Sequence, residues 1–261
     1  LSYDAFGNLA VTVDAVGVRT EMVYDVRGRM TDQSDNAGHR THYEYDGLNR
    51  ILSKTVYDDI FHATAGGDWA ERTTYSYLPG GAVKTTTNGL NQLIEFEYDN
   101  AGRLTTRTAR DVKQADGSSV TLKWQYFYDE DGNLVRDLDA AGNARKYEYD
   151  GLNRLKSTTL LGGSAGTPSS VTTYSATYDA LRKLSEKDLF NNTTTYTYDG
   201  LYRVVGITAN VPANADGSGS ATVRTSYDRV GNVLSNLDAN GHGTTFTYNA
   251  DYTIKSEVDA L

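Results

Sequence analysis

The dipeptide Tyr-Asp recurs along this 261-residue chain at short, regular intervals, and this recurrence constrains the fold more than any other feature. Successive tyrosines are 21, 21, 32, 21, 30, 21, 29, 20, 29 and 21 residues apart when the degenerate copies Tyr77-Leu78 and Tyr248-Asn249 are included. From Tyr45 onward short and long intervals alternate, so the unit there is a pair of about 50 residues. We therefore predict a single array of about eleven repeats over residues 1–261, without a separate domain.

A turn motif follows most of these tyrosines. Asp-x-x-Gly, as in Asp4 to Gly7, suits a type I turn with Asp first and Gly fourth. The carboxylate accepts bonds from the turn's own N–H groups, and Gly tolerates positive φ where the chain enters the next strand. We predict that the structural repeat motif consists of Tyr3, Asp4, Gly7, Tyr24, Asp25, Gly28, Tyr45, Asp46, Tyr98, Asp99, Gly102, Tyr128, Asp129, Gly132, Tyr149, Asp150, Tyr178, Asp179, Tyr198, Asp199, Tyr227, Asp228 and Gly231.

A second Asp-x-x-Gly turn follows about ten residues later, beginning at Asp14, Asp35, Asp139 and Asp238. The segments between turns are about six residues long, the usual length of a strand. In the segment Thr41 to Tyr45 rings and charges alternate with period two, as they do in a strand, and no segment keeps a helical period. The sequence thus predicts an all-β fold of consecutive antiparallel β-hairpins that stack into one long sheet, because a lone hairpin cannot bury its face.

The long repeats carry insertions near residues 57 to 72, 109 to 120, 160 to 171 and 209 to 221. Their Gly, Ser and Ala content is typical of loops. They occur once per pair of repeats, so we expect all four to emerge along the same side of the sheet.

Composition excludes several classes of function. The chain has no Cys, which removes disulfides, thiolate metal sites and cysteine nucleophiles. A net charge of -9, with Lys and Arg spread one or two per repeat, disfavours a nucleic-acid partner. No window of about 18 apolar residues is present, so we expect no membrane insertion by this segment. The first residue is Leu1 rather than Met, which suggests a fragment of a longer polypeptide.

Three motifs resemble known active sites or metal-binding sites. Gly162 to Gly166 matches the Gly-x-Ser-x-Gly nucleophile elbow around Ser164, but it lies in a small-residue insertion rather than between a strand and a helix. The histidines His39, His42, His62 and His242 are scattered, and the first two face opposite ways on one strand. Asp129 to Asn133 resembles half of a calcium loop, but Ala140 stands where the glutamate is required. We predict no metal, no cofactor and no catalytic residue.

Structural roles also explain the recurring aspartates and tyrosines. A glycosidase needs one unusual pair of carboxylates, whereas these aspartates recur at turn positions in every repeat. The tyrosines are expected to stack with those of neighbouring hairpins and form ladders. Trp69 and Trp124 are single rings in or beside long hairpins, and either plug the sheet or contact a partner.

With these motifs the chain resembles the RHS/YD-repeat family, which includes bacterial polymorphic toxins, insecticidal toxin-complex C components and teneurins. The segments YDAFGNL at Tyr3, YDNAGRL at Tyr98, YDEDGNL at Tyr128 and YDGLNR at Tyr45 and Tyr149 carry the resemblance. It implies a β-sheet strip that spirals into a hollow shell around a C-terminal toxic domain, which an aspartic autoprotease releases. After Tyr248 this sequence shows neither the Asp-Pro-rich signature of that protease nor a toxic domain.

The resemblance implies a structural wall segment of a secreted or cell-surface bacterial protein, not an enzyme. Its partners would be the rest of the parent shell and an enclosed toxin domain. The alternative is a recognition module that binds carbohydrate or another cell-surface ligand through exposed tyrosines and the long insertions.

Overall fold

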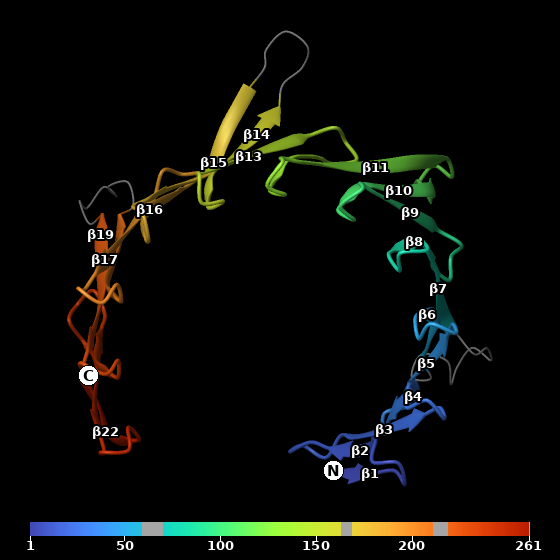
Figure 1. Cartoon of the computed structure of the whole chain (residues 1–261), viewed down its shortest axis with the longest axis horizontal. Coiled ribbons are helices and arrows are strands. Elements are labelled where there is room, and N and C mark those ends of the chain that lie inside the picture. The colour runs from blue at the N-terminus through green and yellow to red at the C-terminus, as the bar shows by residue number, and fades with distance from the viewer. Residues whose placement is uncertain (59–69, 163–168, 211–218, 261) are drawn as a thin grey trace. The chain divides into compact units, whose positions relative to one another are not determined.

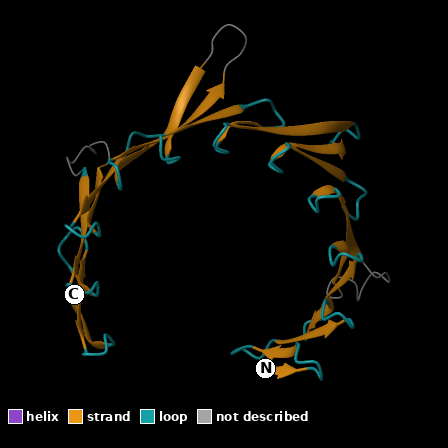
Figure 2. Ribbon diagram, viewed as in Figure 1, coloured by secondary structure: helices purple, strands orange, loops and turns teal. Residues whose placement is uncertain are grey.

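The structure, a computed structural model, describes residues 1–58, 70–162, 169–210 and 219–260. It consists of two compact units, Leu1–Tyr126 with Asp139–Ala141, and Phe127–Leu138 with Gly142–Leu261. Both contain strands and turns, and the described ranges contain no helix, hence none that is long and apolar enough to cross a membrane (Figure 2). Ser164, His62 and Trp69 lie outside the described residues.

Eleven strands belong to the first unit, and β11 runs two residues beyond its boundary. They are β1 (Ser2–Tyr3), β2 (Leu9–Val13), β3 (Arg19–Tyr24), β4 (Met30–Asp35), β5 (His39–Tyr45), β6 (Ile51–Asp58), β7 (Ala70–Tyr77), β8 (Val83–Thr87), β9 (Leu93–Tyr98), β10 (Leu104–Lys113) and β11 (Ser119–Tyr128). The second unit holds β12 (Leu134–Leu138), β13 (Ala144–Tyr149), β14 (Leu155–Gly162), β15 (Ser169–Tyr178), β16 (Lys183–Asp188), β17 (Thr193–Tyr198), β18 (Val204–Asn210), β19 (Ser220–Tyr227), β20 (Val233–Leu237), β21 (Gly243–Tyr248) and β22 (Ile254–Ala260).

Within each unit every strand pairs antiparallel with the next one in the chain (Figure 1). The register shifts beside most repeat tyrosines, for example between Glu44 and Tyr45 and between Glu148 and Tyr149. This bulge is the expected companion of a turn whose last residue has positive φ. The predicted all-β fold of antiparallel hairpins is confirmed; a single array over residues 1–261 stays a prediction.

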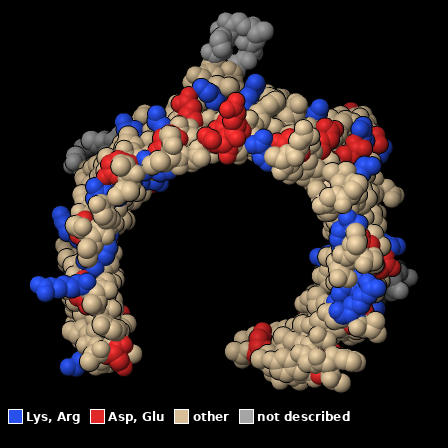
Figure 3. Space-filling model, viewed as in Figure 1, with Lys and Arg blue, Asp and Glu red and all other residues tan. Residues whose placement is uncertain are grey.

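Cross-strand pairing assigns the side chains to two faces in each unit. Tyr45 and Tyr43 share one face of β5, and Tyr43 lies opposite Lys54 of β6. We call the side that carries the repeat tyrosines the tyrosine face. The opposite face carries hydroxyls and paired charges, such as Ser76 bonded to Thr85 and Glu44 paired with Arg72. Basic and acidic side chains are interspersed over the visible surface of each unit (Figure 3).

Neither unit has a conventional hydrophobic core. Among the described residues the buried apolar side chains are only Ala109, Ala144 and Ala176. The solvent-accessible area is 17418 Å², whereas a compact monomer of this mass would expose about 11,000 Å². The hairpins form a single layer, so their order must come from contacts between neighbouring hairpins rather than from a second layer.

The long hairpins project beyond one edge in each unit. In the first unit these are β6–β7, paired out to Tyr57 and Ala70, and β10–β11, paired out to Lys113 and Ser119. In the second unit β14–β15 and β18–β19 do the same (Figure 1). Since antiparallel strands reverse at alternate edges, all these hairpins lie at the edge opposite the Tyr-Asp turns of their own unit. The described strands that flank the insertions thus lie on a common side within each unit, as expected, whereas residues 59–69, 163–168 and 211–218 of the insertions lie outside the described residues.

Candidate functional site

The repeat aspartate organises its own turn through backbone and side-chain bonds. In the turn after Tyr45, the Asp46 carbonyl accepts the N–H of Asn49 at 3.2 Å, and the Asp46 N–H donates to the Arg50 carbonyl at 2.9 Å. Asp46 Oδ1 also accepts the N–H groups of Leu48 and Arg50, at 2.8 and 2.9 Å. One carboxylate oxygen therefore satisfies two donors that the turn leaves unpaired.

The fourth turn residue adopts the left-handed conformation in most repeats, the shorter turn at Asp179 being an exception. Gly7, Gly28 and Gly102 have φ of 86°, 74° and 79°, and no atom lies within 4 Å of a Cβ built on Gly7 or Gly102. In the two YDGLNR segments Asn49 and Asn153 take this position instead, with φ of 65° and 60°. Glycine is thus favoured there for its conformational freedom, and Asn is a common substitute because it tolerates this region better than most residues.

The second carboxylate oxygen binds the side chain four residues along the chain, or three residues along at Asp179. Arginine at this place forms ion pairs of 2.6–2.7 Å between Asp25 and Arg29, Asp46 and Arg50, Asp99 and Arg103, Asp150 and Arg154, Asp179 and Arg182, and Asp199 and Arg203. In other turns asparagine donates its amide to the same oxygen, as Asn8 does to Asp4 at 2.9 Å. Both residues allowed by the motif therefore satisfy the aspartate.

Arginine also reaches the next repeat, which asparagine is too short to do in the same way. Arg154 lies over the ring of Tyr178, with Cζ 4.3 Å from the centroid, and donates to the Asp179 carbonyl at 2.8 Å. Equivalent stacks of 4.5–5.1 Å join Arg29 to Tyr45, Arg50 to Tyr77, Arg182 to Tyr198 and Arg203 to Tyr227. We call the repeat Asp, its Arg and the tyrosine of the next repeat the turn clamp.

The tyrosine hydroxyl ties each repeat back to the preceding one. It donates, at 2.6–3.0 Å, to the carbonyl of the first residue of the strand that follows the preceding turn. The pairs are Tyr24 with Leu9, Tyr45 with Met30, Tyr77 with Ile51, Tyr98 with Val83, Tyr149 with Leu134, Tyr178 with Leu155, Tyr198 with Lys183 and Tyr248 with Val233. The repeat tyrosines are therefore tied to the preceding repeat by hydroxyl–carbonyl bonds and, at several repeats, covered by an arginine. Stacking of tyrosine on tyrosine stays a prediction.

The clamp changes the acidity of its members. The side-chain hydrogen bond from Arg154 lowers the pKa of Asp150 to about 2, and Arg182 lowers that of Asp179 to about 2. Partial burial raises the pKa of Tyr45, Tyr77 and Tyr149. The carboxylates thus stay charged and the phenols stay protonated at neutral pH, which is the state that both bonds need.

The remaining predicted motif residues fit this pattern with local differences. Tyr3 is 62% exposed. Asp129 and Asp228 bind Asn133 and Asn232, and Gly132 and Gly231 have positive φ. The role of Arg as a link between repeats, and the carbonyl partner of each tyrosine, were not predicted. The arginine link could have been predicted from the Arg in the fifth turn position. The carbonyl partner of each tyrosine could not, because the two residues are 15 to 26 positions apart in the sequence.

The motifs that imitate functional sites are explained by local bonds where the structure describes them. His39 bonds Asp35 of its own turn at 2.7 Å, and His42 bonds Asp32 at 3.0 Å. Asp129 accepts both the N–H and the side-chain amide of Asn133, which is the bonding of an ordinary repeat turn. No group of three or more metal-binding side chains occurs in the described ranges.

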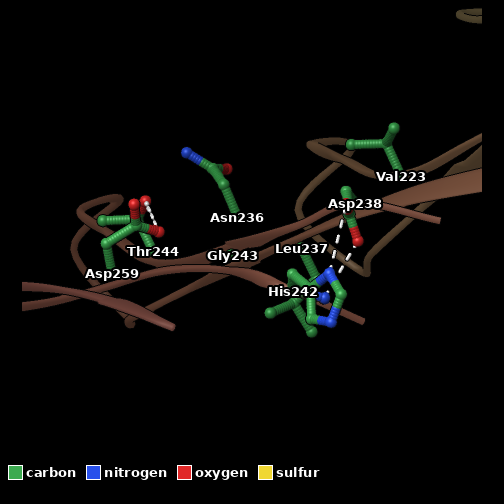
Figure 4. Close-up of a pocket in the computed structure, with 8 residues that line it drawn as sticks. All are labelled: Val223, Asn236, Leu237, Asp238, His242, Gly243, Thr244 and Asp259. Carbon is green, nitrogen blue, oxygen red and sulfur yellow. Dashed lines mark hydrogen bonds and ion pairs between the residues drawn. The ribbon is translucent and has the colours of Figure 1, made fainter. Parts of the chain in front are cut away.

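A shallow hollow of about 480 Å³ lies near the end of the second unit (Figure 4). Its polar lining is already engaged: Asp238 accepts the N–H of His242 at 2.9 Å, and Thr244 donates to Asp259 at 3.4 Å. Asn236 points away from these groups (Figure 4) and accepts a bond from Thr225. The hollow holds no nucleophile paired with a base, so the turn clamp is the better candidate for the functional element.

The repeats match a known family model and several curated proteins. Residues 3–39, 24–59 and 128–165 match the family described as RHS Repeat. This chain is 33% identical to the double-stranded DNA deaminase toxin A of Burkholderia cenocepacia over 102 residues, which are 39% of the chain. It is 29% identical to the probable deoxyribonuclease RhsB of Dickeya dadantii over 126 residues, which are 48% of the chain. Over 113 residues, 41% of this chain, it is 36% identical to toxin subunit YenC2 of Yersinia entomophaga. The match covers 6%, 7% and 11% of these relatives.

Solved structures share the fold over nearly the whole chain. The TcdB2-TccC3 structure without its hypervariable C-terminal region aligns with 97% of this chain at a TM-score of 0.64 and 19% identity. The Photorhabdus luminescens Tc holotoxin pore aligns with 97% of it at a TM-score of 0.63. This chain covers 13% of either neighbour, so the likeness is one of fold in a small part of each.

Proposed function

Because this chain belongs to the RHS/YD-repeat family, we propose that it is a segment of a β-sheet wall that encloses an effector domain of a secreted bacterial protein. The observation that carries the proposal is the turn clamp. Where arginine follows the turn aspartate, the Asp, the Arg and the tyrosine of the next repeat bond one repeat to the next, as Asp150, Arg154 and Tyr178 do. Because the contacts between neighbouring repeats are the same along the chain, further repeats can be added at either end, which suits a wall larger than one domain.

The wall acts by exclusion rather than by bond chemistry. A continuous antiparallel sheet satisfies its backbone hydrogen bonds internally, so it separates two compartments without leaving polar groups unpaired. The relatives named as a deaminase toxin and a deoxyribonuclease support an effector elsewhere in the parent, because the match covers 6% and 7% of them. We assign no catalytic activity to this segment; an assay of the chain against esterase, glycosidase and nuclease substrates tests that assignment.

Protease resistance of the cargo tests the wall. In the intact parent we expect the effector domain to resist digestion, and to become digestible when Arg154 and Arg203 are both changed to Ala, because two clamps then open. Changing the exposed Arg229 to Ala removes a similar side chain without a clamp and leaves protection unchanged. A cargo that stays resistant after residues 1–261 are deleted would overturn the proposal.

The alternative of a carbohydrate-recognition module has narrower support. The stacked repeat tyrosines lie under arginine and use their hydroxyls, so they are poor sugar platforms. Tyr202 and Tyr252 are more exposed, at 58% and 62%, in turns at one edge of the second unit, although Arg182 lies 5.1 Å from the centroid of the Tyr202 ring. Glycan-array binding that is lost in a Tyr202→Ala, Tyr252→Ala variant would favour recognition over enclosure.

A further inference from the structure

Two half-buried cations on the tyrosine face of the first unit have no ion-pair partner among the residues that the structure describes. Arg107 of β10 lies opposite Phe96 of β9 and Trp124 of β11, and Lys54 of β6 lies opposite Tyr43 of β5. Within the described ranges neither side chain forms an ion pair or a hydrogen bond. Glu71 is on the same face and pairs across the strands with Val56, not with Lys54.

Arg107 is held in a defined orientation. Its guanidinium lies over the Trp124 ring, 4.4 Å from the centroid. Stacking covers one flat side of the guanidinium and leaves its in-plane N–H donors free, which is the geometry that binds a carboxylate with two parallel bonds. Other arginines on this chain that lack an acidic partner, such as Arg224 and Arg229, are exposed to solvent.

In the second unit, half-buried charged side chains on the tyrosine face are bonded to partners within the chain. Asp137 is 6% exposed and is bonded by Arg145 and the Tyr147 hydroxyl. Glu186 accepts bonds from Tyr196 at 2.5 Å and Lys183 at 3.0 Å. Partly burying a charge costs free energy unless an opposite charge compensates it. Arg107 and Lys54 therefore lack a partner that equivalent groups possess within the chain.

We propose that the tyrosine face of the first unit binds an acidic, extended polypeptide segment through Arg107 and Lys54. The two residues lie four strand spacings apart, or about 19 Å across the sheet, and the registers between β6 and β10 offset them by a further three or four residues along the strands, which gives about 22 Å in all. An extended chain rises about 3.3 Å per residue, so two carboxylates six residues apart lie about 20 Å from each other and point to the same side, and the length of the lysine side chain makes up the difference. Phe96, Trp124 and Tyr43 supply apolar contacts beside the two charges. The proposal goes beyond enclosure, since it holds whether or not the wall closes around a cargo.

The probe is a fluorescein-labelled eight-residue peptide with Glu at positions 1 and 7 and Ser or Thr elsewhere. We expect it to bind the whole chain at low salt, measured by anisotropy, and more tightly than peptides with Glu at positions 1 and 4 or with Gln at 1 and 7. In the Lys54→Gln, Arg107→Gln variant binding weakens by about tenfold or more. The control variant Lys123→Gln, Arg224→Gln removes one charge from each unit, in each case on the side opposite that unit's repeat tyrosines, and its affinity stays within about twofold.

Three results would overturn the proposal: equal binding of the Gln peptide, equal loss in the control variant, or tighter binding of a thymidine octanucleotide than of the acidic peptide. If the double variant loses its β-sheet circular dichroism, the comparison among peptides on the unchanged chain still decides the matter. Cargo protection in the parent is a separate measurement, so failure of peptide binding leaves the proposed wall untouched, and failure of the wall leaves the peptide site testable.

Discussion

The guanidinium of Arg154 covers the ring of Tyr178 and bonds the carbonyl of Asp179, the residue that follows that ring in the chain. Arg154 is also paired with Asp150 in its own turn at 2.7 Å. One side chain thus connects two repeats whose turns are 29 residues apart in sequence. In a single layer with few buried apolar groups, such links replace much of what a core supplies elsewhere.

Arg154→Ala should weaken the contact between β14–β15 and its neighbours. It removes a partly buried ion pair, a cation–π contact and a hydrogen bond to a carbonyl, together worth about 1–3 kcal/mol. Arg154→Asn should cost less, because asparagine can bond Asp150 as Asn133 bonds Asp129. Native-state hydrogen exchange of the β14–β16 amides measures both opening free energies. Equal losses in the two variants would show that the link to the next repeat contributes nothing.

Tyr45→Phe should destabilise the first unit by about 0.5–1.5 kcal/mol, because the Met30 carbonyl loses its hydroxyl donor while the ring stays under Arg29. Tyr202→Phe is the matched control, since that ring is 58% exposed. Urea denaturation followed by circular dichroism compares the two. An unchanged midpoint in Tyr45→Phe would mean that water replaces the hydroxyl without cost.

Tyr252→Asn should stabilise the last repeat turn by about 0.5–1 kcal/mol. Tyr252 has φ of 65°, a region that costs a bulky residue about 1–2 kcal/mol and that asparagine accepts more readily. Asn49 and Asn153 already occupy the same turn position. The reverse change, Asn153→Tyr, should destabilise its turn by a similar amount. Amide exchange rates in β21 and β22 report the first effect, and a faster exchange in Tyr252→Asn would contradict it.

Acid should loosen the repeats within a defined pH window. The folded-state pKa values of Asp150 and Asp179 are lowered from 3.8 to about 2 by their arginines. A lowered folded pKa gives stability that is complete above the unfolded value and is lost as pH falls through the folded value. The urea midpoint should therefore decline between about pH 4 and pH 2. Asp150→Asn should lower the midpoint at neutral pH and reduce its dependence on acid; a midpoint independent of pH in the unchanged chain would refute this.

Local sequence patterns anticipated much of this molecule. The Tyr-Asp interval and the Asp-x-x-Gly motif predicted the turns and the hairpins, and the alternation of short and long intervals predicted that the long hairpins share one side. These features are accessible because a turn involves only a few neighbouring residues, and because the side-chain period of a strand is visible in its own segment. The YDGLNR turns depart from the Asp-x-x-Gly motif, because their glycine, such as Gly47, is the second turn residue and Asn49 takes the left-handed conformation at the fourth.

Contacts between residues far apart in the chain were decided by the tertiary structure. The sequence by itself determined a repeated β-hairpin, because each aspartate, turn and strand obeys rules that act within about ten residues. Only the fold decided that Tyr45 meets the Met30 carbonyl and that Arg107 lies over Trp124 with no acidic partner among the described residues. These pairings depend on cross-strand register, which places side chains side by side only after the hairpins have stacked.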